Sequence, residues 1–150
     1  MKILLMLFLS LNVFGYDKLY PDKKLTPGVT RDVHMAVLCL AGSTKDVRNV
    51  TQSMKNEVFS RYGFIKGKFK PGDYEIDHFI SLELGGANDI KNLWPQPYSK
   101  SGTVFGAREK DVVETNLHRR ICNKQITLQA AQKIITTDWI AEYKSIKGLK

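Results

Sequence analysis

Several features are scarce or missing in this chain. It contains no internal repeat, no low-complexity tract and no change in composition that would mark a second domain. After residue 15 it contains no long apolar stretch, so a membrane span, which requires about 20 apolar residues, is not expected. With 43% hydrophobic and 25% charged residues among 150, the composition is that of an ordinary globular protein of one-domain size.

Acidic residues are also in deficit. The chain has 15 Asp and Glu against 23 Lys and Arg, which gives a formal net charge of +8. A basic protein favours a polyanionic partner such as nucleic acid or an anionic surface. The alternative is that the charge only keeps the protein soluble.

The first fifteen residues have the pattern of a secretory signal peptide. Lys2 supplies a positive start, residues 3–14 are almost wholly apolar, and Gly15 is a small residue where cleavage would fall. No cysteine follows the apolar stretch, so a lipid anchor is not expected either. We therefore predict an exported protein, periplasmic or secreted and without a membrane anchor, whose single domain spans residues 16–150.

Cys39 and Cys122 are the two cysteines of the chain. An exported protein meets an oxidising compartment, so a disulfide between them is the natural inference. The alternative is a pair of buried free thiols. Two cysteines without a nearby histidine pair do not predict a zinc cluster.

Three segments have the periodicity of helices. Thr51 or Ser53 can cap a helix that runs to Tyr62, and Thr127 can cap an amphipathic helix that ends near Tyr143. Between them, residues 107–122 carry Val113, Leu117 and Ile121 as an apolar stripe. By contrast, residues 16–29 are expected to be extended or loosely packed.

Two short strands are predicted around a Gly-Gly turn. They are residues 74–80 and 92–94, with the turn at positions 85 and 86. The second strand is expected to be brief, because Pro95 and Pro97 follow it and proline cannot continue a paired strand.

Asp77 and His78 lie side by side in the first of these strands, and Asn92 begins the second. An imidazole with an ordinary pKa near 6.5 can take a proton from water at neutral pH, so His78 is the candidate general base. The carboxylate of Asp77 is a hard oxygen ligand suited to Mg²⁺ or Mn²⁺. Because neighbouring side chains of a strand point apart, the two groups could lie on opposite sides of a phosphate.

This stretch resembles the HNH endonuclease family. The resemblance rests on YEIDHFISLELGGAND at residues 74–89 and on NL at residues 92–93. The chain is also similar to a group of small exported bacterial proteins with this motif. That second similarity extends to NLWPQPY at residues 92–98, to Lys110-Asp111 with Glu114, and to LQAAQ at residues 128–132.

The resemblance implies an α+β fold with a central ββα-metal finger flanked by helices. It assigns to Asn92 the role of bonding across the hairpin and fixing the loop that carries the base. The third position of the family, a metal ligand early in the helix, has no match at the usual spacing. We carry it to Asp111, with Glu114 as second and His118 as third candidate.

Other interpretations apply to each of these helix residues. Asp111, Glu114 and His118 form one polar line on the predicted helix. Asp111 could simply favour the positive end of the helix, and His118 could pair with Glu114 as a surface contact. Asn88 and Asp89 are interpreted as turn formers.

Basic residues near the motif are candidates for contact with nucleic acid. Lysines alternate with Phe64 and Phe69 along residues 64–72, a pattern that suits a groove in which cations meet phosphates and rings stack on bases. The alternative is a solvated edge strand protected by lysines. The candidate residues are Lys66, Lys68, Lys70, Arg108 and Lys110.

Together these features predict an endonuclease that hydrolyses DNA, and RNA as a second substrate, with a divalent metal, Mg²⁺ first and Mn²⁺ or Zn²⁺ as alternatives. A second hypothesis is a non-catalytic module that binds nucleic acid or an anionic polymer on the same scaffold. A third is a toxin, which would require an immunity protein as partner; no partner protein is evident otherwise.

Overall fold

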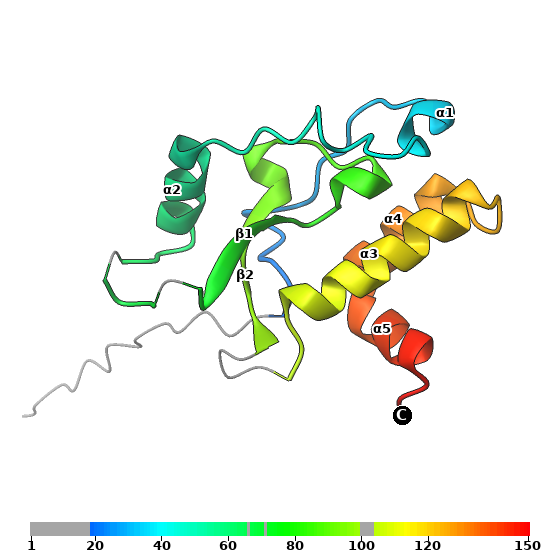
Figure 1. Cartoon of the computed structure of the whole chain (residues 1–150). Helices are drawn as coiled ribbons and strands as arrows, with labels where there is room; N and C mark the ends of the chain where they lie inside the picture. Colours follow the sequence, from blue (N-terminus) through cyan, green and yellow to red (C-terminus); the bar gives the residue numbers. More distant parts are fainter. Residues whose placement is uncertain (1–18, 66, 71, 100–103) are drawn as a thin grey trace, which may run out of the picture.

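A computed structural model describes residues 19–65, 67–70, 72–99 and 104–150. These residues form an α+β fold in which a two-stranded antiparallel sheet lies beside a group of helices (Figure 1). None of the described helices is long and apolar enough to cross a membrane. The predicted signal peptide and Lys66 lie outside the described residues. The elements in order are α1 (Met35–Leu38), α2 (Gln52–Arg61), β1 (Tyr74–His78), β2 (Leu93–Pro97), α3 (Ala107–Cys122), α4 (Leu128–Thr137) and α5 (Trp139–Lys147).

β1 and β2 form the predicted hairpin, in which His78 pairs with Leu93. The connection between them is more than a turn, because it contains the short 3-10 helices η1 (Leu82–Leu84) and η2 (Ile90–Asn92). Gly86 is required at its closest point, since a Cβ there would overlap the carbonyl oxygen of Ile80. The polar residues of the motif are therefore presented by a tightly packed loop.

The prediction that the second strand stops before its prolines was wrong, because β2 continues through Pro95 to Pro97. The hydrogen-bond ladder gives the reason. The N–H of Tyr98 donates to the carbonyl of Asp73, which pairs across the ladder. Bonded and non-bonded pairs alternate in an antiparallel ladder, so both prolines fall at positions whose nitrogen faces away from β1. No ladder bond is lost.

α3 coincides with the helix predicted at residues 107–122. Its stripe of Val113, Leu117 and Ile121 is buried and packs with Ile135 of α4 and Trp139 of α5. Burial of such side chains stabilises the fold by roughly 2 kcal/mol each. This packing fixes the face that α3 turns toward the hairpin.

Two of the other predicted elements need correction. The last helix is divided into α4 and α5 at Asp138, whose side chain accepts a hydrogen bond from the N–H of Ala141 and so caps a new helix. The described part of the entry segment is also well packed: Thr26 is buried and donates to the carbonyl of Leu93, while Trp139 donates its indole N–H to the carbonyl of Leu19. Residues 19–29 contain no helix or strand, so of the two expected alternatives only the loosely packed one was wrong.

Candidate functional site

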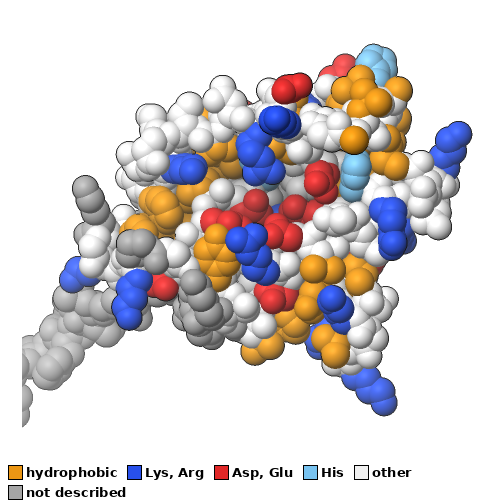
Figure 2. All heavy atoms as spheres, in the orientation of Figure 1, with side chains coloured by type: hydrophobic (Ala, Val, Ile, Leu, Met, Phe, Trp, Pro, Cys, Tyr) orange, Lys and Arg blue, Asp and Glu red, His pale blue; other side chains and the backbone are white. Residues whose placement is uncertain are grey.

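A pocket of about 170 Å³ lies where the end of β1 meets α3. Figure 2 shows a group of acidic side chains near the middle of this face, with basic side chains on either side. The pocket brings together Asp77, His78, Asp111 and Glu114, all of which were singled out from the sequence. Its complete lining is Arg48, Asp77, His78, Ser81, Leu82, Glu83, Asp111, Glu114 and Thr115.

His78 is held in one orientation by Asn88. Its Nε2 lies 2.8 Å from Oδ1 of Asn88, while the amide nitrogen of Asn88 donates to the carbonyl of Val47. Because the amide oxygen can only accept, Nε2 must donate, and Nδ1 of the neutral ring is the nitrogen that can accept a proton. Asn88 is thus more than the turn former that its sequence position indicates.

His78 is only 3% exposed. Burial lowers its pKa below the ordinary value of 6.5, against the raising effects of the Asn88 hydrogen bond and of Asp77. The ring is therefore neutral at physiological pH, which is the state that a general base requires.

Asn92 makes the hydrogen bonds across the loop that its place in the motif suggested. Its side chain accepts from the N–H of Ile80 and donates to the carbonyls of Ile80 and Ala87, at 2.9 to 3.0 Å. The residue is fully buried. It connects the segment that follows β1 to the start of β2 and so fixes the loop that begins after His78 and carries Asn88.

Lys110 was expected to contact nucleic acid, but its position does not fit that role. It is fully buried, and its ammonium donates to Oδ2 of Asp77 and to the carbonyl of His78, both at 2.7 Å, and to Glu114. Its three N–H donors are thus all used inside the protein. Although burial opposes the charge, Asp77 and Glu114 raise the pKa of Lys110, so the residue stays positive.

Two further carboxyl groups near this lysine have shifted pKa values. Burial raises the pKa of Glu114 despite the nearby ammonium. Burial and then the charge of Asp77 raise that of Asp111, which also forms an exposed ion pair with Arg108 at 3.1 Å. Burial is the main cause of both raised pKa values, so these carboxyl groups hold their protons more readily than exposed ones do.

The donor set of the pocket fits a hard divalent cation. Asp77, Asp111 and Glu114 offer carboxylate oxygens, of which Lys110 occupies one each on Asp77 and Glu114. They do not form a closed cage: the one group of three Cys, His, Asp or Glu ligand atoms within 4.8 Å among the described residues lies elsewhere. Mg²⁺ suits an open arrangement, because it keeps several waters and binds through one or two carboxylates and a substrate phosphate.

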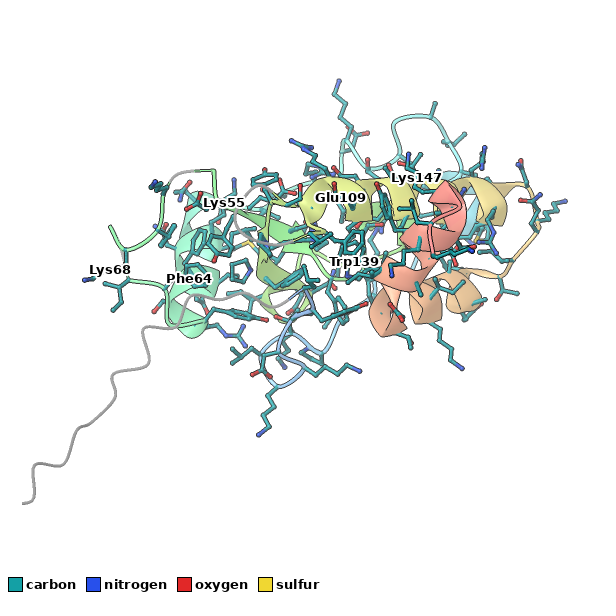
Figure 3. All side chains as sticks on the ribbon, turned by 90° about the horizontal axis from the view of Figure 1, so that it is seen from below. Lys55, Phe64, Lys68, Glu109, Trp139 and Lys147 are labelled. Atoms are coloured by element: carbon teal, nitrogen blue, oxygen red, sulfur yellow. A yellow bond between two sulfur atoms is a disulfide. The ribbon has the colours of Figure 1, made fainter. Side chains whose placement is uncertain are left out.

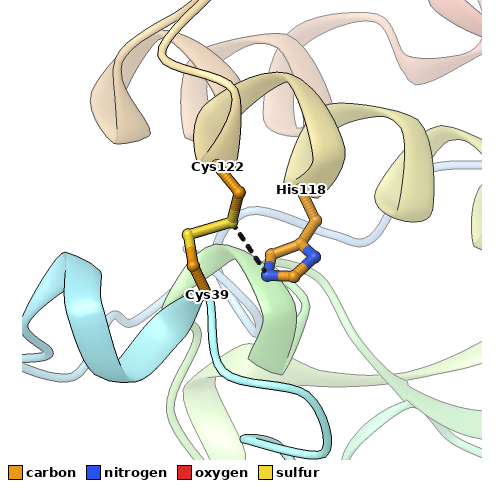
Figure 4. Close-up of side chains that lie close together, drawn as sticks. All are labelled: Cys39, His118 and Cys122. Atoms are coloured by element: carbon orange, nitrogen blue, oxygen red, sulfur yellow. Dashed lines mark hydrogen bonds between the residues drawn. A yellow bond between two sulfur atoms is a disulfide. The ribbon is translucent and has the colours of Figure 1, made fainter.

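That other group consists of Cys39, His118 and Cys122 (Figure 4). The predicted disulfide is present and uses both sulfurs, so these residues are not a metal site in this state. Nε2 of His118 lies 3.0 Å from the carbonyl oxygen of Leu38 and 3.5 Å from Sγ of Cys122. The interpretation of His118 as a partner of Glu114 was therefore wrong, and its ring lies beside the disulfide.

The lysines that follow α2 lie away from the pocket. Figure 3 shows Phe64 and Lys68 at the end of the molecule beside α2, opposite α4 and α5, with Lys68 pointing outward. Lys68 and Lys70 are exposed, as a contact with a polyanion requires. Phe64 and Phe69 pack against each other and Phe59, with ring centroids 5.0 to 5.3 Å apart. The three rings form a half-buried cluster, and a ring face that contacts another ring cannot stack on a base.

Arg108 lies at the edge of the pocket, beside a pair that the sequence analysis missed. Its guanidinium is 5.5 Å from the ring centroid of Tyr98, and the hydroxyl of Tyr98 donates to Glu75 at 2.5 Å. Burial is the main cause that raises the pKa of Glu75. Glu75 and Asp77 are on one face of β1, and this two-residue spacing could have indicated the pair.

Arg48 was also missed as a pocket residue. It comes from the irregular segment before α2, about thirty positions ahead of the motif, and the sequence contains no local pattern that connects the two. Comparisons with protein-family models, with curated proteins and with solved structures found no match. What this chain does must therefore be inferred from the pocket.

Proposed function

We propose that the protein is an exported, divalent-metal-dependent endonuclease that hydrolyses phosphodiester bonds in DNA, with RNA as a second substrate. The observation that carries the proposal is the pocket itself, in which a neutral, oriented imidazole lies beside a carboxylate. The order of hairpin and helix and the hydrogen bonds of Asn92 support the interpretation of β1, β2 and α3 as a ββα-metal finger of the HNH type.

His78 would act as the general base. With Nε2 donating to Asn88, Nδ1 can accept a proton from the water that attacks phosphorus. Asn88 and Asn92 would position the ring, one by direct contact and the other through the loop. Neither would take part in proton transfer, because an amide side chain does not titrate.

Asp77 would hold the metal, with Asp111 or Glu114 as further ligands from α3. A divalent cation at this place would neutralise the charge that develops on the phosphoryl group and stabilise the departing oxygen. Lys110 would hold Asp77 and Glu114 in place through its contacts with both and with the backbone of His78. The buried lysine is thus a support of the site and not a contact of the nucleic acid.

Export is supported by two independent features. The Cys39–Cys122 disulfide is typical of proteins that fold in an oxidising compartment. The first fifteen residues have the composition of a signal peptide.

The test is cleavage of supercoiled plasmid by purified protein with Mg²⁺, Mn²⁺ or Zn²⁺. We expect cutting that EDTA stops and that His78→Ala reduces by at least about 100-fold, the range of a positioned acid or base. His34→Ala is the matched control, because His34 is exposed and lies outside the pocket. Uncut plasmid with all three metals, or equal cutting by the two variants, would contradict the proposal.

One observation favours a second candidate function. Lys110 already supplies a cation between Asp77 and Glu114, so the finger could be a metal-free scaffold that binds nucleic acid without cutting it. Such a module should retard DNA in a gel with EDTA present and leave it intact with every metal. An endonuclease should cut under at least one of those conditions.

A further inference from the structure

Arg48 is an exposed arginine that lies beside acidic residues. It lines the pocket together with Asp77, Asp111 and Glu114. Within the part of the chain that the structure describes, its guanidinium nevertheless forms no ion pair and no hydrogen bond. The group is therefore free to bind an anion that enters the pocket.

The backbone beside Arg48 is tied to the residue that orients the base. Asn88 donates its amide N–H to the carbonyl of Val47, the residue before Arg48, and accepts from His78 through its amide oxygen. One side chain thus holds both the imidazole and the segment that carries the arginine. The positive charge of Arg48 repels the protonated imidazole and so contributes to the lowered pKa of His78.

The other end of this segment is anchored as well. Cys39 is bonded to Cys122 of α3, Leu38 is buried, and the hydroxyl of Ser43 donates to the carbonyl of Leu38. Residues 39–48 therefore cross from the end of α3 to the mouth of the pocket with both ends fixed. An arginine on an anchored segment is pre-organised for a ligand, so less conformational entropy is lost on binding.

We propose that Arg48 binds the non-bridging oxygens of the substrate phosphate in this pocket. The inference rests on the proposed function and names a residue of the same site. A planar guanidinium can donate two parallel hydrogen bonds to a phosphate. The pocket needs such a cation because its carboxylates repel a phosphate unless positive groups offset their charge.

The experiment compares Arg48→Met and Arg48→Lys with Arg119→Met. Arg119 is an exposed arginine near the end of α3 and lies outside the pocket, so it controls for the loss of one positive charge. The first measurement is steady-state hydrolysis of bis(p-nitrophenyl) phosphate, a single phosphodiester without bases, with the metal that supports plasmid cutting. The second is binding of a short fluorescent DNA duplex in EDTA at several salt concentrations.

We expect Arg48→Met to lower kcat/KM by about 100-fold, the effect of removing one donor to a developing oxyanion. Arg48→Lys should recover part of the loss, and Arg119→Met should behave as wild type. In the binding measurement, Arg48→Met should reduce the slope of log affinity against log salt by about one. Unfolding midpoints of the three variants should agree, because both arginines are exposed.

Equal kinetics and equal salt slopes for Arg48→Met and Arg119→Met would overturn the inference and leave the proposed function standing. If wild type cleaves neither the diester nor plasmid, the proposed function fails, and the salt slopes alone decide on Arg48. A slope reduced in Arg48→Met and not in Arg119→Met would still support phosphate binding by Arg48. Equal slopes would then overturn it.

Discussion

Lys110 supplies the counter-charge for two carboxylates of the pocket. Its ammonium is fully buried between Asp77 and Glu114 and has no contact with solvent. Replacing both partners of such a pair by apolar groups can be neutral, whereas removing one partner leaves an uncompensated buried charge. The lysine is therefore a structural requirement of the site.

We expect Lys110→Met to lower the free energy of unfolding by about 3 kcal/mol. Methionine fills a similar volume but leaves the carboxylates of Asp77 and Glu114 without a counter-charge. Urea unfolding monitored by circular dichroism measures the change, with Lys133→Met on the exposed face of α4 as the control. A Lys110→Met protein as stable as the control would show that the ammonium does not stabilise the fold.

His78 should titrate below its ordinary pKa of 6.5 in the metal-free protein. Burial disfavours the charged ring, so the folded state binds fewer protons than the unfolded state. The contribution of His78 to the free energy of unfolding is then fully present above about pH 6.5 and decreases as the pH falls toward the folded pKa. Two-dimensional NMR of the imidazole in EDTA measures the value.

Asn88→Ala provides the matched variant for this titration. The amide oxygen of Asn88 stabilises the protonated ring, so its removal should lower the pKa of His78 further. A titration of wild type at or above 6.5 would contradict the expected environment of the ring.

The sequence was sufficient to single out Asp77, His78 and Asn92, because their residue types and spacing carry chemical information. It did not predict the partner of Asp77. Lys110 lies in a helix whose polar face could equally have faced solvent, and a lysine is rarely buried. Only the packing of α3 against the hairpin decides that this side chain is enclosed.

At the level of elements, the connection between β1 and β2 depends on one amide. Asn92 supplies three hydrogen bonds to the backbone of Ile80 and Ala87, and the two to Ile80 are buried. We expect Asn92→Ala to lower the free energy of unfolding by about 3 kcal/mol, at about 1 kcal/mol for each bond. Chemical denaturation measures the loss, and cleavage should fall with it because the loop positions His78.

Asn92→Asp and Asn56→Ala refine this prediction. Aspartate can still accept from Ile80 but loses both donors, so its stability should be lower than that of wild type. Asn56 is exposed on α2, where its side chain accepts from Gln52, and Asn56→Ala should change stability by no more than about 0.5 kcal/mol. Equal stability of Asn92→Ala and Asn56→Ala would refute the structural role of Asn92.

The helices were predicted better than the connections. The bounds of α3 agree with the prediction because its apolar stripe has the helical period and Gly106 precedes it. α2 begins after Thr51, whose side chain caps the helix. The division between α4 and α5 was missed, although Asp138 is a residue type that caps helices. α1, with four residues, has too few positions to show any period.

At the scale of the whole molecule, the disulfide joins the segment after α1 to the last turn of α3 across a sequence separation of 83. Closing a loop of this length restricts the unfolded chain, so we expect the double variant Cys39→Ser, Cys122→Ser to lose about 4 kcal/mol of stability. Urea unfolding of the variant and of wild type under reducing conditions should give the same midpoint. A loss below about 1 kcal/mol would show that the loop is held by its other contacts.

The overall arrangement could be predicted only in outline. Charge, the apolar start and the spacing of the motif indicated a basic α+β protein with a hairpin followed by a helix. The contact of Arg48 with the pocket could not be predicted, because it depends on the long-range closure between Cys39 and Cys122. The pairing of these cysteines follows from their number, but the path of the chain between Cys39 and Arg48 does not.

The two prolines of β2 have a consequence for the behaviour of the protein in concentrated solution. Their nitrogens face away from β1, so the outer edge of the strand lacks N–H donors at Pro95 and Pro97. All five residues of β2 are buried and α2 packs against the strand, so the protein's own elements cover this edge, and the prolines leave no buried N–H without a partner there. An edge that is both covered and poor in donors disfavours edge-to-edge aggregation. The sheet is thus protected from the addition of a third strand from another molecule, even when the newly folded protein is concentrated.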